Sequence, residues 1–111
     1  KKNGATQRIV RNAVSYVKKN YASPIGVNEV AGYLGISSSY FSTLFRKETG
    51  EKFISFLIRY KMDKACEMLD QSNLRIYEIS ERLGYVDVKY FCRIFRKYIG
   101  CTPSEYRERS C

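Results

Sequence analysis

Two short stretches of this sequence concentrate side chains that could recognise a duplex rather than make or break bonds. One stretch offers hydroxyl groups and a guanidinium, on Ser38, Ser39, Ser42, Thr43 and Arg46. The other offers cations and small groups, on Val88, Lys89, Cys92, Arg93 and Arg96. Hydroxyls donate or accept hydrogen bonds at base edges and phosphates, and Arg and Lys suit the O6 and N7 atoms of guanine. Neither set contains an acidic side chain, so both could approach the polyanionic surface of DNA.

The two stretches divide into side chains for bases and side chains for phosphates. We expect base contacts from Ser38, Ser39, Ser42, Thr43, Val88, Lys89, Cys92 and Arg93. We expect phosphate contacts from Arg46, Lys47, Arg96 and Lys97. These four cations lie toward the C-terminal end of each predicted helix, which should rise out of the groove. Any single serine could equally face solvent without a partner, whereas the mid-helix position of Arg93 favours contact.

The remaining residues serve catalytic chemistry poorly. The chain has no His, which excludes His-based general base catalysis and His-ligated metal sites. None of its four cysteines, Cys66, Cys92, Cys101 and Cys111, stands in a C-x-x-C pair. This spacing argues against zinc, and without a signal peptide we expect free thiols, with Cys66 packed and Cys111 frayed. We therefore expect no enzyme activity, no metal and no cofactor.

Composition and charge point the same way. The 111 residues carry 20 Lys and Arg against 11 Asp and Glu, a formal net charge of +9. A basic excess of this size is typical of a nucleic-acid binder. No run of 18 apolar residues is present, so the sequence predicts no membrane span and a cytoplasmic protein. Residues 1–6 are predicted to be a polar linker or a remnant left where the chain was cut from a larger protein.

Apolar residues recur at helical spacing along the chain, which predicts an all-α fold of about seven helices. The predicted helices cover residues 7–21, 27–34, 38–49, 53–71, 76–83, 88–99 and a short segment after Thr102. Ser37 and Asp87 are placed to cap the helices that follow them, and Gly closes several helices at the other end. Thr102, Pro103 and Glu105 form a capping box with proline at the first helical position.

A repeat divides these helices into two similar modules. Tyr40-Phe41, Phe45-Arg46-Lys47 and Gly50 return as Tyr90-Phe91, Phe95-Arg96-Lys97 and Gly100, so six of eleven positions agree at an offset of 50. Two helices joined by a short turn containing Gly are typical of a helix-turn-helix. We name residues 27–50 module one and residues 76–100 module two, joined by a long linker helix over 53–71. Lys61 falls within the apolar stripe of that helix, and we expect its stem to pack while its head reaches water.

The sequence resembles the DNA-binding domain of AraC-type bacterial transcription regulators over about residues 9–107. The runs that carry the resemblance are VNEVAGYLGISSSYFSTLFRKETG, KMDKACEML and IYEISERLGYVDVKYFCRIFRKYIGCTPSEYR. The resemblance is closest to output domains of two-component response regulators. It implies a DNA-binding domain over residues 7–111 with two helix-turn-helix motifs on a central linker helix. It places the base-reading positions at Ser39, Ser42, Thr43, Val88, Lys89, Cys92 and Arg93.

The resemblance also implies partners for the whole protein. Such domains bind promoter DNA through both recognition helices and usually activate transcription by touching RNA polymerase. A receiver or ligand-binding domain N-terminal to this chain is implied too. We expect the two recognition helices to enter successive major grooves about 34 Å apart, one turn of B-DNA. The alternative hypothesis is a basic helical protein–protein interaction module, which would need an exposed apolar groove that the sequence does not reveal.

This chain departs from the family pattern at three places. The linker helix usually has Arg where Lys61 stands, and Lys cannot make the same bidentate contacts. Gly26 occupies a usual Ser or Thr capping position, a change that should cost only a few tenths of a kcal/mol. Arg75 likewise offers no acceptor at the corresponding start in module two.

Overall fold

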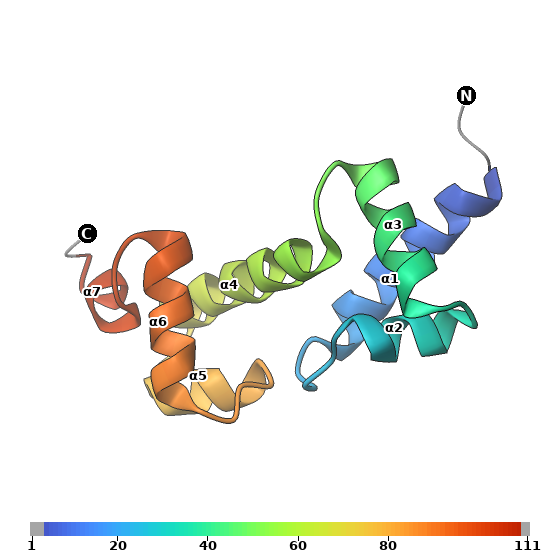
Figure 1. The fold of residues 1–111 in the computed structure, drawn as a ribbon. Coiled ribbons are helices and arrows are strands. Elements are labelled where there is room, and N and C mark those ends of the chain that lie inside the picture. The colour runs from blue at the N-terminus through green and yellow to red at the C-terminus, as the bar shows by residue number, and fades with distance from the viewer. Residues whose placement is uncertain (1–3, 110–111) are drawn as a thin grey trace. The chain divides into compact units, whose positions relative to one another are not determined.

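The computed structural model describes residues 4–109, and within them it contains seven helices and no strand (Figure 1). This confirms the predicted all-α class. The helices are α1 (Gly4–Asn20), α2 (Val27–Leu34), α3 (Ser38–Thr49), α4 (Phe53–Gln71), α5 (Ile76–Arg82), α6 (Val88–Ile99) and α7 (Pro103–Arg107). The prediction misplaced the start of α1, which begins three residues before Gln7 and takes in part of the segment expected to be a linker.

Side-chain caps fix the starts of the second helix in each module. The Ser37 hydroxyl accepts a hydrogen bond from the Tyr40 amide at 3.1 Å, and the Asp87 carboxylate accepts one from the Lys89 amide at 2.9 Å. The first helix of each module is capped instead by the side chain of its third residue. Glu29 and Glu78 accept hydrogen bonds from the amides of Gly26 and Arg75, at 2.8 and 2.7 Å. Both modules therefore begin their helices in the same way despite lacking Ser or Thr before α2 and α5.

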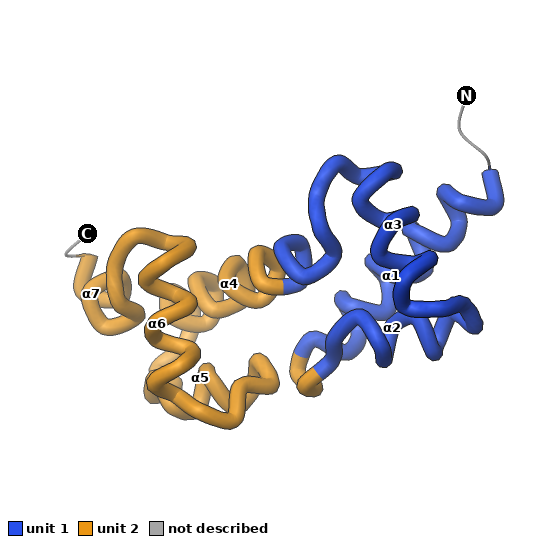
Figure 2. Tube along the Cα trace, viewed as in Figure 1, with its two compact units in different colours: residues 1–21, 25–57 blue, residues 22–24, 58–111 orange. Residues whose placement is uncertain are grey.

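The chain divides into two compact units, coloured separately in Figure 2. The first comprises residues 1–21 and 25–57, and the second comprises residues 22–24 and 58–111. In the first unit α1, α2 and α3 pack on one another around an aromatic core. The Phe53 ring meets Phe41 and Phe45 edge-on, with centroids 5.0 and 5.3 Å apart. Replacing one such buried Phe by Ala typically costs about 3–5 kcal/mol.

The second unit packs α5, α6 and α7 with the greater part of α4. Its buried side chains include Leu69, Ile79, Leu83, Phe91 and Phe95. Arg107 attaches α7 to the end of α4 through three backbone carbonyls. Its guanidinium donates to the carbonyls of Leu69, Ser72 and Leu74, at 3.3, 3.2 and 2.6 Å.

Lys61 lies inside the second unit, and its stem is packed as the sequence predicts. Only 4% of this residue is exposed, and its Nζ lies 4.9 Å from the centroid of the Tyr85 ring. Burial lowers the pKa of Lys61, and burial raises the pKa of Tyr85 to about 12. The ring face offers the ammonium group a cation–π contact in place of the lost water.

The cysteines also differ from the prediction. Cys66 and Cys92 are free and half-buried, whereas Cys101 is buried and disulfide-bonded. The expectation of free thiols is therefore wrong at Cys101, and the expectation for Cys111 lies outside the described residues. Burial is the largest influence on both free thiols and raises the pKa of each.

Candidate nucleic-acid interface

Helix α3 buries one face and exposes the other. Phe41, Leu44 and Phe45 are buried in the first unit. The opposite face presents Ser39, Ser42, Thr43 and Arg46 to solvent. This division follows from the helical period, because positions three and four apart share a face. The structure thus places these four predicted site residues together on one exposed surface, which we name the α3 face.

Ser38 stands apart from the other hydroxyls of α3. It is half-buried, and its hydroxyl donates a hydrogen bond to Oδ1 of Asn28 at 2.6 Å. This bond joins the start of α3 to α2 and occupies the only proton of the hydroxyl. Toward a nucleic acid, Ser38 in this arrangement can act only as an acceptor.

Helix α6 has the same two-sided arrangement with different chemistry. Phe91 and Phe95 are buried, while Lys89, Arg93 and Arg96 are exposed. Val88 and Cys92 lie half-buried between the two faces. We name the surface formed by Val88, Lys89, Cys92, Arg93 and Arg96 the α6 face. A raised thiol pKa keeps Cys92 protonated near neutral pH, so it offers a small, weakly polar contact rather than a nucleophile.

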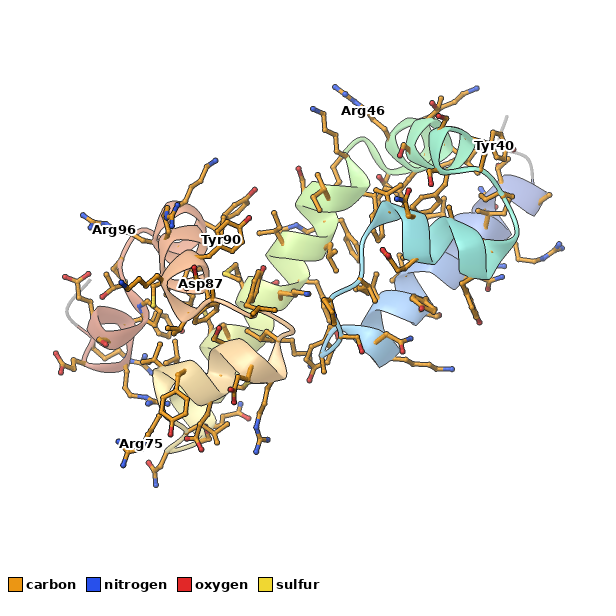
Figure 3. The ribbon with its side chains drawn as sticks, turned by 60° about the horizontal axis from the view of Figure 1, so that its bottom comes forward. Tyr40, Arg46, Arg75, Asp87, Tyr90 and Arg96 are labelled. Atoms are coloured by element: carbon orange, nitrogen blue, oxygen red, sulfur yellow. The ribbon has the colours of Figure 1, made fainter. Side chains whose placement is uncertain are left out.

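The four predicted phosphate contacts lie in the last turns of the two helices. Arg46 and Lys47 end α3, Arg96 and Lys97 end α6, and all four are exposed. Figure 3 shows Arg46 and Arg96 extending away from their helices. Cations at this position also stabilise a helix by interacting with its C-terminal carbonyls. Their exposure leaves the guanidinium groups accessible to an anion.

Two exposed tyrosines accompany these faces and were not among the predicted site residues. Tyr40 is 48% exposed and Tyr90 is 44% exposed, at equivalent positions near the starts of α3 and α6 (Figure 3). The guanidinium carbon of Arg93 lies 5.8 Å from the centroid of the Tyr90 ring. The repeat of Tyr-Phe in both modules was the signal available in the sequence, but it could not tell the exposed ring from the buried one.

Within residues 4–109, no group of three or more Cys, Asp or Glu side chains is arranged to hold a metal ion. The same part of the chain has no helix that is both long and apolar enough to cross a membrane.

Comparison with known proteins relates the chain to helix-turn-helix regulators. The family described as "Helix-turn-helix domain" matches residues 30–109. An uncharacterized HTH-type transcriptional regulator of Escherichia coli (strain K12), YpdC, is 37% identical over 95 residues, covering 86% of this chain and 33% of that protein. The chain spans 29–40% of the length of the first three curated relatives it matches.

Solved structures show the same arrangement of helices. The C-terminal domain of AraT, a response regulator from Geobacillus stearothermophilus, is 37% identical with a TM-score of 0.89, covering 91% of this chain and 84% of that one. The DNA-binding domain of AdpA, a global transcriptional factor solved in complex with a target DNA, has a TM-score of 0.85 over 90% of each chain. At 23% identity, this second likeness shows the fold alone.

Proposed function

This chain belongs to the AraC-type helix-turn-helix family of transcription regulators, and we propose that it binds double-stranded DNA in a sequence-specific manner through α3 and α6. The family is a class of DNA-binding regulators and not a class of enzymes. In the proposed complex the base contacts come from Ser38, Ser39, Ser42, Thr43, Val88, Lys89, Cys92 and Arg93. The phosphate contacts come from Arg46, Lys47, Arg96 and Lys97.

The observation that carries the proposal is the chemistry of the two exposed helix faces. Each belongs to the second helix of a helix-turn-helix module, which is the element that enters the major groove in such proteins. Each face combines hydrogen-bonding or cationic side chains and carries no acidic one. A solvated helix surface without a binding role usually carries charges of both signs.

We propose further that one chain reads two adjacent major grooves. The support is the repeat itself, because each module supplies a complete reading helix of twelve residues. Footprinting at saturating protein should then show two protected major-groove patches about one helical turn apart. A single protected patch from a folded domain would contradict this part of the proposal.

For the whole protein, we propose a cytoplasmic transcription regulator that activates its promoters and touches RNA polymerase. The chain spans only about a third of its curated relatives, and the AraT structure is described as the C-terminal domain of a response regulator. These two facts support an N-terminal receiver or ligand-binding domain beside this one. Transcription in vitro with the full-length protein, with and without its promoter site, tests the activating role.

Binding to random duplex DNA as a function of salt tests the central proposal. A DNA binder loses affinity steeply as salt rises, and the slope of log K against log salt counts its phosphate contacts. Fluorescence anisotropy with a labelled duplex gives this slope without knowledge of the operator. Affinity that is absent, or flat across the salt range, would favour the alternative of a basic protein–protein interaction module.

A further inference from the structure

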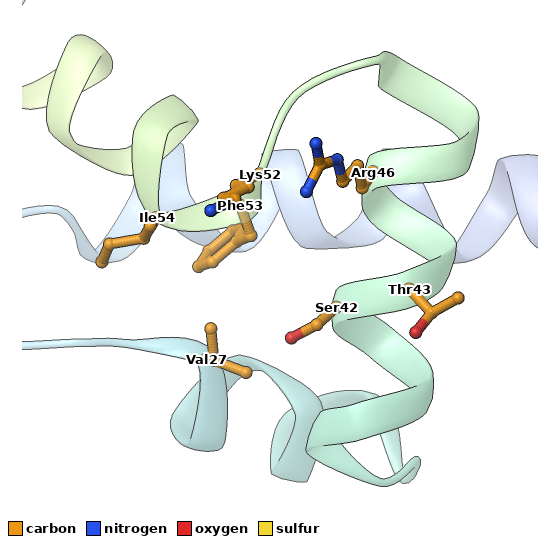
Figure 4. Close-up of a pocket in the computed structure, with 7 residues that line it drawn as sticks. All are labelled: Val27, Ser42, Thr43, Arg46, Lys52, Phe53 and Ile54. Carbon is orange, nitrogen blue, oxygen red and sulfur yellow. The ribbon is translucent and has the colours of Figure 1, made fainter.

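A pocket of about 320 Å³ opens beside the α3 face, within the first unit (Figure 4). Three elements line it. Val27 comes from α2, while Ser42, Thr43 and Arg46 come from α3. The segment at the start of α4 contributes the rest, from Lys52 to Ile54. No residue of that segment was among the predicted site residues.

The pocket has a cationic side and an apolar side. Arg46 and Lys52 are both exposed, and the charged side chains that line the pocket are both basic. Figure 4 shows the Arg46 guanidinium directed from α3 toward the start of α4, where Lys52 stands. The apolar side consists of Val27 and Ile54, above the buried Phe53 ring. Ile54 is 47% exposed, which leaves a large apolar side chain uncovered in the free protein.

We propose that this pocket receives one sugar–phosphate unit of the DNA backbone. The phosphate lies between Arg46 and Lys52, and the deoxyribose packs against Ile54 and Val27. This inference rests on the proposed function and adds Lys52 and Ile54 to the interface. A backbone nucleotide matches the pocket because it is anionic at one end and apolar on the face of its sugar ring.

The position of the pocket favours a DNA strand over a free anion. Ser42 and Thr43, which are candidate base contacts, line the same space as the two cations. A strand whose bases are read by these hydroxyls must pass its backbone along the edge of the α3 face. A free phosphate would satisfy the cations but would leave Ile54 uncovered.

Module two has no equivalent of this pair of cations. At the repeat offset of 50, Lys52 corresponds to Thr102 and Ile54 corresponds to Ser104. The charged residue that follows is Glu105, which is acidic and not basic. The pairing of Arg46 with a lysine is therefore not repeated at the equivalent positions after module two.

The salt dependence of duplex binding tests the inference. Lys52→Ala should weaken binding to all sequences and lower the salt slope by about one, as expected when one phosphate contact is lost. Lys52→Arg keeps the charge and should retain the wild-type slope. Lys19→Ala removes the same charge from the exposed end of α1 and should leave the slope within error of wild type. Ile54→Ala should weaken binding roughly two- to fivefold at an unchanged slope, because an apolar contact releases no counterions.

The outcomes separate this inference from the proposed function. If the wild-type chain binds duplex DNA with a steep salt slope but Lys52→Ala keeps that slope, the pocket does not hold a phosphate. If the wild-type chain itself does not bind duplex DNA, the result contradicts the proposed function and not only the pocket. If the Ile54→Ala variant binds as tightly as wild type at every salt concentration, the deoxyribose does not pack against Ile54. Thermal melts of each variant verify that the fold is intact.

Discussion

The two helix-turn-helix modules share a backbone plan but surround it with different charges. In module one, Arg46 shares its pocket with a second cation, Lys52. In module two, the position equivalent to Lys52 is the uncharged Thr102, and the charged residue that follows it is the acidic Glu105. The reading faces differ in the same sense, since α3 offers Ser and Thr where α6 offers Lys89 and Arg93.

The difference shows which positions the fold requires and which are free to vary. Buried Phe and helix-ending Gly are the same in both modules, because packing and left-handed backbone admit few alternatives. The exposed positions diverge because the fold does not constrain them. We therefore propose that module two contributes more to discriminating bases and module one more to holding the backbone.

The largest expected effect concerns a pair of equivalent glycines, Gly35 and Gly84. Both have positive φ, at 73° and 83°, so Ala at either position should cost about 1–2 kcal/mol from backbone strain. A Cβ at Gly84 would also come within 2.8 Å of the Ser23 carbonyl, whereas a Cβ at Gly35 would meet nothing within 4 Å. Gly84→Ala should therefore lower the free energy of unfolding by about 3–5 kcal/mol in total. Urea denaturation of both variants measures this, and equal losses would contradict the comparison.

The next effect concerns base discrimination by the two faces. Arg93→Ala should weaken binding to the specific site by about 1–3 kcal/mol and flatten the preference at one or two positions. Thr43→Ala, the matched change on α3, should cost less, because a hydroxyl discriminates weakly among bases. Selection from randomised duplexes gives the preferences of each variant. If Arg93→Ala retains the wild-type preference, the reading face of module two has been misplaced.

A smaller effect separates the two arginines that end α3 and α6. Arg46→Ala should weaken binding to all sequences and lower the salt slope by about one. Arg96→Ala should lower the slope by no more than this, since no second cation stands at the position equivalent to Lys52. Anisotropy titrations over a salt series compare the two variants directly. A larger change for Arg96→Ala would reverse the assignment of the backbone-holding role.

The smallest effect is expected from Glu105→Gln. Hydrogen bonds from the backbone amide and the hydroxyl side chain of Thr102 lower the pKa of Glu105, followed by the charge of Arg96. Gln keeps an acceptor for the Thr102 amide, 2.9 Å away, but removes the negative charge beside Arg96. Duplex affinity should rise by about twofold or less, as is usual for exposed charge pairs.

The same carboxylate gives a pH dependence to stability. The ionised Glu105 side chain contributes fully to the free energy of unfolding above the ordinary Glu pKa of about 4.3. This contribution is lost as pH falls through the lowered pKa of Glu105. Glu105→Gln should therefore flatten the acid limb of a stability–pH curve. An unchanged acid limb would mean that the Thr102–Glu105 capping box adds nothing to the stability of the charged form.

Most helix bounds could be predicted because the sequence marks them chemically. Ser37 and Asp87 do cap α3 and α6, and the predicted span of α4 matches the structure. The start of α1 was missed because Gly4 and the residues after it lack an apolar period, and glycine is a poor helix former. Helical spacing placed Lys61 within the apolar stripe of α4, but the Tyr85 ring beside its ammonium group comes from a distant part of the chain and could not be predicted.

The candidate site divides in the same way. The exposed positions of α3 and α6 follow from the helical period within a single helix. Ser38 was grouped with the other hydroxyls because the sequence did not reveal its hydrogen bond to Asn28. That bond joins residues ten positions apart in two different helices. The pocket of Arg46, Lys52 and Ile54 was missed because it forms only where three elements meet. A one-dimensional pattern cannot place such residues together.

The contact between Gly84 and Ser23 bears on how this chain can be cut. Residues 22–24 connect two helices of the first unit, yet they belong to the second unit and are exposed. A protease that cleaves there would leave every helix of both modules intact. The cut would nevertheless disturb the turn after α5, because Gly84 in that turn packs closely against the backbone of Ser23. A fragment beginning at Ile58 would consequently lack residues 22–24, which belong to the same compact unit as the rest of that fragment.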